Sequence, residues 1–356
     1  MRVGILTSGG DCQALNATMA GLARTLYKNV KDVEIIGFID GYKGLMNGNY
    51  KIMEPSDFEG ISNLGGTILG SSRCPFKMMR VIEDGFDKVE AMKNTYKKLK
   101  LDSLAVLGGN GSIKSANMLS EEGLNVIGLP KTIDNDTWGT DYTFGYQSAI
   151  NIATNYLDQI NTTANSHHRV FVVEIMGHKV GHICLSAGIA ADCPIILLPE
   201  IPYDIKNITK VIKRRQKAGV NYTVIACSEG ALSVDEAKLT KKEYKKVVAK
   251  RKGLSVVYGI ADELAKQIDG EIRTAVCGHV QRGGNPCPYD RKISALFGIE
   301  GARLIMDQDF GKFVVLNGEK ITSIKLEDTA GKLKYVDVKG KTVKNAKLLG
   351  ISFGDE

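Results

Sequence analysis

Short, continuous apolar runs alternate with helix-like stretches along this 356-residue chain, and this alternation constrains its fold more than any other feature. A strand that is apolar along its whole length is typical of a parallel sheet, because helices cover both faces of such a sheet. The pattern therefore predicts an α/β protein. Seven runs are expected as strands: residues 2–7, 33–38, 103–107, 126–129, 170–175, 195–198 and 220–226.

Glycine, hydroxyl and carboxylate residues directly follow six of these runs. Ligands bind beyond the carboxyl ends of the strands in open α/β sheets, so we expect the chemistry there. The loops 8–10 (Ser-Gly-Gly) and 108–112 (Gly-Gly-Asn-Gly-Ser) would let backbone amides approach a phosphate at a helix N-terminus. A tight strand-to-helix turn is the alternative for either loop alone. Neither loop matches the P-loop motif, and the dinucleotide fingerprint is missing from the sequence.

Two carboxylates, Asp134 and Asp136, stand two residues apart after the run 126–129. In an extended segment they would point the same way, one to accept a hydroxyl proton and the other to assist a metal. An acidic turn or helix cap is the alternative. Phosphoryl transfer also needs arginines near turn residues to clamp phosphate groups, and the candidates are Arg73, Arg169, Arg273 and Arg282.

Composition excludes several classes of function. The sequence has no run of about 18 apolar residues, so we expect no membrane span, and its strand-like start lacks a signal sequence, so we expect the cytoplasm. The seven cysteines are scattered without C-x-x-C pairs and are expected to be free thiols. The net charge of +7 comes from lysines without interleaved aromatic residues, which argues against nucleic acid.

Two further segments are expected to carry no chemistry. Residues 238–255 are rich in lysine, with little apolar stripe, and are typical of a solvated basic helix. The tail from about Phe310 alternates valine and lysine with turn residues, and a short closing hairpin is expected there, for example at 334–340. We assign the tail no catalytic role.

Taken together, the motifs resemble the phosphofructokinase family. The resemblance runs from Met1 to about Asp307 and is carried by segments 6–11, 65–71, 131–136, 176–177 and 278–284. It implies a phosphofructokinase fold of two similar Rossmann-like domains with mainly parallel sheets. Residues 1–145 with about 281–331 would bind the phosphoryl donor, ATP, and residues 146–280 with about 332–356 would bind the sugar phosphate. The implied reaction moves the γ-phosphoryl group of ATP to the 1-hydroxyl of fructose 6-phosphate.

The resemblance also implies a role for each matching residue. Asp134 would be the base, assisted by Thr132, Arg73 and Asp136, and Mg²⁺ would be held through Asn110 and Asp136. The residues implied to bind the phosphoryl donor are Gly10, Arg73, Cys74, Gly109, Asn110, Gly111, Ser112 and Lys131. Those implied to bind the sugar phosphate are Thr132, Ile133, Asp134, Arg169, Met176, Gly177, His178, Glu229, Arg273, His279, Val280, Gln281 and Arg282. Arg169 and Arg273 would reach the 6-phosphate across a subunit interface of a dimer or tetramer.

Asn110, His178 and Lys131 depart from the pattern of the familiar bacterial ATP enzymes, whereas Gly111 matches it. Asn110 replaces a magnesium-linked Asp of ATP-using relatives, and His178 replaces an Arg, which makes that phosphate contact weaker or pH-sensitive. Gly111 leaves room for a nucleotide, because an Asp there, as in diphosphate-using relatives, would crowd and repel its α-phosphate. Lys131, in contrast, is typical of diphosphate-using relatives. This mixture resembles the subgroup between ATP and diphosphate enzymes, and we favour ATP.

Three alternatives stay open. One is a diphosphate-dependent, reversible phosphofructokinase. Another is a non-catalytic regulatory subunit, which Asn110 motivates but the retained Asp134 and arginines oppose. A lipid or NAD kinase can share a similar glycine loop but would not need segment 279–284.

Overall fold

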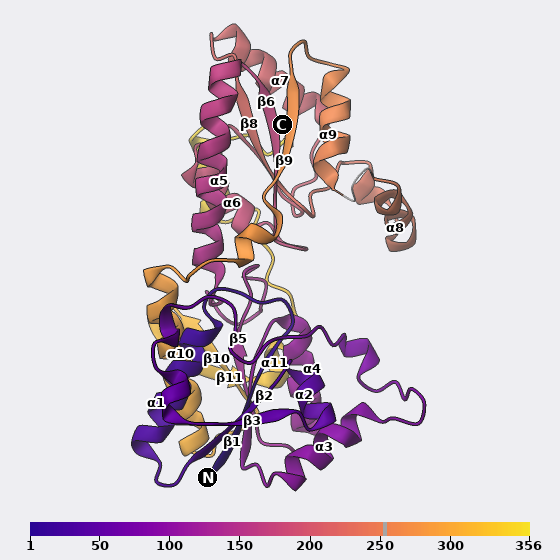
Figure 1. The fold of residues 1–356 in the computed structure, drawn as a ribbon. Coiled ribbons are helices and arrows are strands. Elements are labelled where there is room, and N and C mark those ends of the chain that lie inside the picture. The colour runs from indigo at the N-terminus through magenta and orange to yellow at the C-terminus, as the bar shows by residue number, and fades with distance from the viewer. Residues whose placement is uncertain (252–254) are drawn as a thin grey trace. The chain divides into compact units, whose positions relative to one another are not determined.

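The structure, a computed structural model, describes residues 1–251 and 255–356, which form two compact units (Figure 1). Unit 1 comprises residues 1–148 and 282–334, and unit 2 comprises residues 149–281 and 335–356. Each unit has its own sheet and its own hydrophobic core. The sequence divides the chain near 145, 281 and 331, and its assignment of the phosphoryl donor and the sugar phosphate to the two parts stays a prediction.

Unit 1 is built on a seven-stranded sheet with the order β11-β10-β5-β4-β1-β2-β3. The strands are β1 (Arg2–Ser8), β2 (Glu34–Phe38), β3 (Tyr50–Met53), β4 (Ser103–Gly108), β5 (Val126–Pro130), β10 (Lys312–Asn317) and β11 (Lys320–Lys325). Only the edge strands β3 and β11 pair antiparallel to their neighbours, among the strands described. The parallel register, in which Leu6 lies beside Val106 and Val106 beside Gly128, brings the carboxyl ends of β1, β4 and β5 to one edge.

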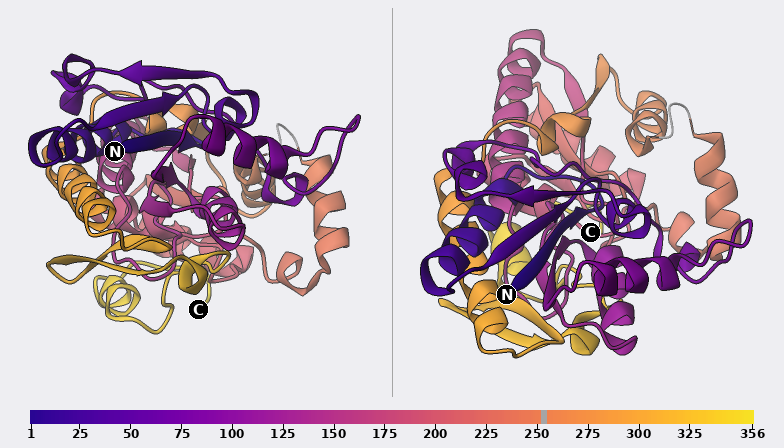
Figure 2. Two further views of the ribbon diagram at one scale, coloured as in Figure 1. Left: turned by 90° about the horizontal axis from the view of Figure 1, so that it is seen from below. Right: turned by 60° about the horizontal axis from the view of Figure 1, so that its bottom comes forward.

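Helices cover both faces of this sheet (Figures 1 and 2). The pair α1 (Leu15–Asn29) and α10 (Pro288–Met306) lies side by side on one face. Glycines allow this close approach, because a Cβ on Gly21 would lie 2.4 Å from the Ala295 carbonyl oxygen. The other face carries α2 (Tyr42–Asn47), α3 (Lys88–Lys98), α4 (Asn110–Glu121) and α11 (Leu326–Thr329). Short 3₁₀ helices occupy connecting segments: η1 (Pro55–Phe58), η2 (Ile61–Asn63) and η3 (Phe76–Met78).

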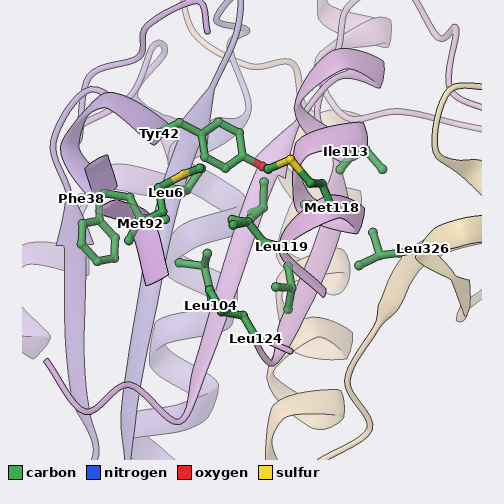
Figure 3. Packing of buried hydrophobic residues seen from close by; sticks show 14 of the residues in the cluster. Leu6, Phe38, Tyr42, Met92, Leu104, Ile113, Met118, Leu119, Leu124 and Leu326 are labelled. Atoms are coloured by element: carbon green, nitrogen blue, oxygen red, sulfur yellow. The ribbon is translucent and has the colours of Figure 1, made fainter. Parts of the chain in front are cut away.

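A core cluster of unit 1 lies between the sheet and the helices α2, α3, α4 and α11 (Figure 3). Leu6 and Leu104 from the strands are fully buried there together with Met92 of α3 and Leu119 of α4. Burying one such side chain stabilises the fold by about 1.5–3 kcal/mol. This packing fixes α4, and with it the glycine loop at the N-terminus of α4.

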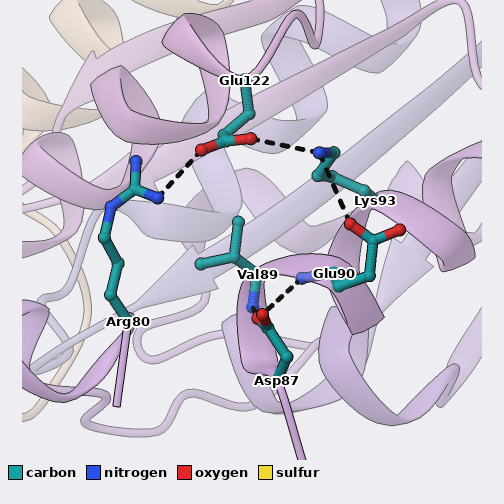
Figure 4. Close-up of polar contacts among 6 residues, drawn as sticks. All are labelled: Arg80, Asp87, Val89, Glu90, Lys93 and Glu122. Atoms are coloured by element: carbon teal, nitrogen blue, oxygen red, sulfur yellow. Dashed lines mark hydrogen bonds and ion pairs between the residues drawn. The ribbon is translucent and has the colours of Figure 1, made fainter. Parts of the chain in front are cut away.

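The opposite end of α4 is tied down by polar contacts (Figure 4). The carboxylate of Glu122 accepts from Arg80 at 2.9 Å and from Lys93 at 3.1 Å. These hydrogen bonds, that from Lys93 first, hold the pKa of Glu122 below its usual value. Asp87 caps α3 by accepting from the backbone amides of Val89 and Glu90. The ion pair with Lys93 links α3 to the end of α4, and because the side chains of both ion pairs are partly exposed they add little stability.

Unit 2 contains a four-stranded, fully parallel sheet with the order β7-β8-β6-β9. Its strands are β6 (Val170–Ile175), β7 (Ile195–Leu197), β8 (Thr223–Ser228) and β9 (Ile272–Val276). One face packs on α7 (Ile205–Lys217) and α9 (Val256–Ala265), and the other on α6 (His182–Ala190). The remaining helices are α5 (Tyr146–His167), which begins in unit 1, α8 (Lys241–Lys250), α12 (Lys341–Leu348), η4 (Glu236–Lys238) and η6 (Gly278–Arg282).

The predicted α/β class is confirmed, and all seven predicted strands form. The tail does contain a hairpin, but its predicted position was wrong. The hairpin joins β10 and β11, whereas residues 334–340, all of which the structure describes, form no strand. The expected basic helix is shorter than predicted, because α8 covers only Lys241–Lys250. Residues 252–254, the end of that basic segment, lie outside the described residues.

Two expectations from composition can also be compared with the structure. All seven cysteines lie within the described residues and are free thiols, as predicted. Among the helices that the structure describes, none has the length and apolar character needed to cross a bilayer.

The core of unit 1 gives a first testable prediction. Leu104→Ala removes a fully buried side chain and leaves a cavity, so it should lower the free energy of unfolding by about 2–5 kcal/mol. Equilibrium unfolding in urea measures this loss. Leu64→Ala is the matched control, because Leu64 is 47% exposed and should cost less than about 1 kcal/mol. Equal losses for the two variants would contradict the assignment of this core.

Candidate active site

Three loops of unit 1 meet at the carboxyl edge of β1, β4 and β5. A Cβ placed on Gly9, after β1, would lie 3.5 Å from Ser112 Oγ and 3.4 Å from Lys131 Nζ. Ser112 belongs to the glycine loop after β4, and Lys131 directly follows β5. Two glycine loops and the start of the carboxylate segment therefore converge on one point, as the positions of the strand ends predict.

Lys131 connects two of these loops from a buried position. Its side chain is nearly inaccessible, and Nζ donates a hydrogen bond to the carbonyl oxygen of Gly10. Burial lowers the pKa of Lys131, and the nearby Arg282 lowers it further. Lys131 therefore holds the first glycine loop in place.

Arg282 lies against the same loop, although the sequence groups it with the residues for the sugar phosphate. Its Nη1 donates to the carbonyl oxygen of Asp11 at 2.9 Å. A Cβ on Gly10 would lie only 2.8 Å from this Nη1, so any larger residue at position 10 would displace the guanidinium group. The amide of Gln13 adds a second link by donating to the carbonyl oxygen of Gly283 at 3.1 Å.

Arg73 follows a pair of serines that brace the first loop from the other side. Ser71 Oγ donates to the carbonyl oxygen of Gly9 at 2.6 Å, and the Gly9 amide donates to Ser72 O at 3.1 Å. The side chain of Arg73 is exposed next to this contact, and Cys74 packs half-buried against the core. The serines thus position the one predicted arginine that is both in unit 1 and exposed.

The segment with the two carboxylates is buried but not extended. Asp134 and Asp136 are 9% and 7% exposed, and Ile133 between Thr132 and Asp134 is fully buried. The segment is not extended at Asn135, which adopts a left-handed conformation with φ of 53°, so the extended arrangement considered from the sequence does not form and the alternative of a turn does. Asparagine tolerates this conformation better than most residues.

Hydrogen bonds hold the turn in this segment. The Asp134 amide donates to Thr132 Oγ1 at 3.1 Å, and the Thr143 amide donates to Asn135 Oδ1 at 3.1 Å. Thr143 Oγ1 also donates to the carbonyl oxygen of Thr132 at 2.7 Å. Local hydrogen bonds thus fix the backbone on both sides of Asp134.

The second glycine loop opens α4 at Asn110. A Cβ on Gly111 would meet nothing within 4 Å, so this position faces open space. The positive end of the α4 dipole and these open backbone amides suit an anionic group. The Asn110 side chain donates through Nδ2 to the carbonyl oxygen of Lys332 at 2.5 Å.

Lys334 contacts the loop that follows Asp134, and the sequence analysis did not identify it as a site residue. Its Nζ donates to Asn135 Oδ1 at 2.9 Å and to the carbonyl oxygens of Thr140 and Asp141 at 2.8 and 2.9 Å. Burial lowers the pKa of Lys334 to about 8, although Asp141 and Asp136 act against this shift. No pattern in the sequence links position 334 to position 135, because about 200 residues separate them.

In unit 2, the ends of the paired strands β6 and β8 bring two predicted groups together. Oε1 of Glu229 accepts from the backbone amides of Gly177 at 3.1 Å and His178 at 2.6 Å. Glu229 thereby shapes the turn that carries Met176, half-buried, and His178, exposed. His178 has φ of 53°, a conformation that this carboxylate helps to hold.

Two predicted arginines of unit 2 share a carboxylate that the sequence interpretation missed. Arg169 precedes β6 and Arg273 lies in the neighbouring β9, with Phe171 beside Arg273 in the register. Glu271 accepts from both guanidinium groups and forms an ion pair with each. The hydrogen bond from Arg169 is the main cause that lowers the pKa of Glu271. Glu271 directly precedes β9, a strand that the sequence analysis did not predict, so no pattern in the sequence identified it.

The predicted site residues in η6 differ in their exposure to solvent. His279 and Val280 are exposed, whereas Gln281 is fully buried and donates through Nε2 to the carbonyl oxygen of Gly278 at 3.2 Å. Of the three, His279 and Val280 are accessible to a ligand, and Gln281 supports the turn.

The residues of unit 1 fit a magnesium ion that is bound partly by the protein and partly by substrate phosphates. The described residues contain no group of three or more His, Cys, Asp or Glu side chains that could hold a metal. Mg²⁺, however, is usually bound through one or two carboxylates together with substrate phosphates. Asp136, 7% exposed and next to the base candidate Asp134, supplies one such carboxylate, and Asn110 at the start of α4 adds an amide oxygen.

Comparisons with known proteins agree on one family. Residues 2–305 match the sequence model of the family described as Phosphofructokinase. A protein of Spirochaeta thermophila named ATP-dependent 6-phosphofructokinase is 46% identical over 99% of this chain and 97% of its own. A protein of Amycolatopsis methanolica, named pyrophosphate--fructose 6-phosphate 1-phosphotransferase, is 38% identical over 94% of this chain and 96% of its own. The structure of Pichia pastoris phosphofructokinase in the T-state superimposes with a TM-score of 0.78 at 27% identity, over 99% of this chain and 37% of that one.

Proposed function

The chain belongs to the phosphofructokinase family, and we propose that it is a 6-phosphofructokinase that uses ATP. It would transfer the γ-phosphoryl group of ATP to the 1-hydroxyl of fructose 6-phosphate, giving fructose 1,6-bisphosphate and ADP. The observation that carries the proposal is the meeting of two glycine loops and a buried carboxylate segment at the carboxyl edge of β1, β4 and β5. Phosphoryl transfer needs anion-binding amides beside a base, and this edge offers both.

The space around Gly111 supports ATP as the phosphoryl donor. Nothing lies within 4 Å of a Cβ at this position, so a nucleotide α-phosphate has room near the start of α4. Lys131, the residue that points to diphosphate, already donates to the Gly10 carbonyl oxygen and is buried. This contact favours its interpretation as a support of the loop. The named ATP-dependent relatives, at 38–46% identity, point the same way.

The chemical step is assigned to groups whose backbone is fixed. Asp134 would accept the proton of the 1-hydroxyl as that oxygen forms its bond to the γ-phosphorus and the bond to ADP breaks. Thr132 Oγ1 accepts a hydrogen bond from the Asp134 amide. The exposed Arg73 would stabilise the negative charge on the transferred phosphoryl group. Gly10, Cys74 and the loop from Gly109 to Ser112 would line the side of the ATP.

Magnesium belongs to the proposal as the partner of the ATP phosphates. Asp136 would contribute a carboxylate, and the amide oxygen of Asn110 could accept from a metal-bound water without adding charge. Bound in this way, the ion would neutralise charge that develops on the phosphates.

Unit 2 would bind the sugar phosphate. Met176, Gly177, His178, Glu229, His279 and Val280 are proposed to contact fructose 6-phosphate, with Gln281 supporting the turn that carries His279 and Val280. Arg282, a residue of unit 1, is also proposed to bind this substrate. Arg169 and Arg273 would clamp the 6-phosphate of a neighbouring subunit's substrate, so the active enzyme is expected to be a dimer or tetramer. We also propose that it works in the cytoplasm, in glycolysis.

A diphosphate-dependent reaction is the second candidate. Lys131 Nζ lies at the meeting point of the two glycine loops, and a named diphosphate-using relative shares 38% identity over most of the chain. This alternative differs from the main proposal in the donor alone, so a change at position 111 can separate the two.

Asp134→Asn tests the assigned base. It keeps the size of the side chain but cannot accept the proton, so kcat should fall about 10²- to 10⁴-fold. Steady-state kinetics of fructose 1,6-bisphosphate formation measure this loss. Asp102→Asn is the control, because Asp102 lies at the opposite end of β4 and accepts from the Arg2 amide. A variant of Asp134 with normal turnover would exclude it as the base, whereas a wild type without turnover would favour the regulatory subunit.

Gly111→Asp tests the choice of phosphoryl donor. Its carboxylate would occupy the open space at the start of α4 and repel the nucleotide, so kcat/KM for ATP should fall about tenfold or more. Gly111→Ala adds a Cβ without charge and should retain ATP use. Parallel assays with ATP and with diphosphate compare the variants. If the Asp and Ala variants used ATP equally well, position 111 would not select the donor.

Glu271→Gln tests the arginine pair. A 6-phosphate has to compete with the Glu271 carboxylate for Arg169 and Arg273, so removing this charge should lower KM for fructose 6-phosphate about two- to fivefold, as for an exposed ion pair. Glu263→Gln in α9 breaks a surface pair with Lys266 and should leave KM unchanged. A higher KM for the Glu271 variant would show that the carboxylate positions the arginines instead of competing.

A further inference from the structure

The tail residues 332–334, here called the clasp segment, contact both the glycine loop of α4 and the carboxylate segment. Leu333 forms an antiparallel bridge with Thr137, and the Lys334 amide donates to the carbonyl oxygen of Asp136 at 2.9 Å. The carbonyl oxygen of Lys332 accepts from Asn110 Nδ2 at 2.5 Å. One short stretch of chain therefore touches both predicted magnesium residues, Asn110 and Asp136.

The Lys334 ammonium group uses its three donors on the loop that follows Asp134. Its acceptors are the Asn135 side chain and the carbonyl oxygens of Thr140 and Asp141, all within 2.9 Å. Asn135 is also the residue with the left-handed backbone between the two carboxylates. A hydrogen bond from a charged group is stronger than a neutral one, so Lys334 is well placed to hold this conformation.

Asn110 completes the clasp through a hydrogen bond that an Asp could not make. Its Nδ2 is a donor, and an ionised carboxylate at the same position has only acceptors. An Asp at 110 would therefore face the Lys332 carbonyl oxygen with like partial charge. The side-chain amide of Asn110 therefore provides the donor that this contact with the clasp segment requires.

We propose that Lys334 is a positioning residue for the phosphoryl-transfer reaction, acting through the turn at Asn135 to hold Asp134 and Asp136 in place. The inference rests on the proposed function, because it assigns a geometry to the base of that reaction. Lys334 itself would touch neither substrate nor metal. Its removal should therefore lower kcat while the affinity for fructose 6-phosphate, assigned to unit 2, changes little.

Lys334→Met tests the proposal, with Lys332→Met as the matched control. Both variants lose one ammonium group from the clasp segment, and both keep the backbone bonds to Asp136 and Asn110. The Lys332 side chain is exposed, whereas Lys334 is half-buried against the loop. For each variant we would measure kcat and KM, together with deuterium uptake of peptides covering residues 132–145 in the protein without substrate.

The Lys334→Met variant should lose about 100-fold in kcat, the scale of a misplacement of about 1 Å, with KM for fructose 6-phosphate within about threefold. Deuterium uptake over 132–145 should rise, and the emission or acrylamide quenching of Trp138, the single tryptophan of the chain, should change with it. The Lys332→Met variant should match the wild type in all of these measurements.

Two results would overturn the proposal. One is normal kcat in the Lys334 variant, whether or not deuterium uptake rises, since the lysine would then serve stability alone. The other is a loss of kcat with unchanged deuterium uptake over 132–145, since the lysine would then not act through this turn. If the wild type made no fructose 1,6-bisphosphate, the proposed function would fail, while the uptake of 132–145 would still test the clasp.

A second variant keeps the test valid if Lys334→Met does not fold. Asn110→Asp replaces a half-buried side chain with one of the same size, and it exchanges the donor to the Lys332 carbonyl oxygen for a charged acceptor without opening a cavity, so it should fold. Deuterium uptake of peptides covering residues 330–336 should then rise relative to the wild type. Unchanged uptake would show that Asn110 does not hold the clasp segment and would contradict the proposal.

Discussion

The parallel register of β1, β4 and β5 is the constraint on which the rest of unit 1 depends. Because Leu6, Val106 and Gly128 lie side by side in the sheet, three loops that are far apart in sequence begin at one edge. The buried leucines on one face and the α1–α10 pair on the other fix that sheet. A shift of one strand would move the loops apart, so the core packing and the chemistry cannot be separated.

Two lysines, Lys131 and Lys334, hold the backbone of this edge. Each donates to carbonyl oxygens of a loop, the first to Gly10 and the second to Thr140 and Asp141. Burial removes water from both ammonium groups and lowers the pKa of both lysines. Their hydrogen bonds to backbone carbonyl oxygens hold each loop in one conformation. A buried lysine that donates to a backbone carbonyl oxygen has a structural role without phosphate, and this is why Lys131 is weak evidence for a diphosphate enzyme.

The sequence predicted those parts of the fold that depend on local pattern. Continuous apolar runs identified β1, β4, β5 and β6, because a fully buried strand needs apolar residues throughout. Strand β9 was missed because its residues, from Ile272 to Val276, are half-buried or exposed and include Arg273. The turn at Asn135 was missed because the left-handed backbone depends on hydrogen bonds from Thr143 and Lys334, which are distant or unpatterned in the sequence.

The structure brings most predicted site residues together in groups, each within one unit, and their roles are proposals. The central claim is that the edge of β1, β4 and β5 transfers a phosphoryl group from ATP to fructose 6-phosphate. The most direct measurement is formation of fructose 1,6-bisphosphate by the purified protein, with ATP and with diphosphate in parallel and with Mg²⁺ present. The account predicts product with ATP and little or none with diphosphate. Product with diphosphate alone, or with neither donor, would contradict it.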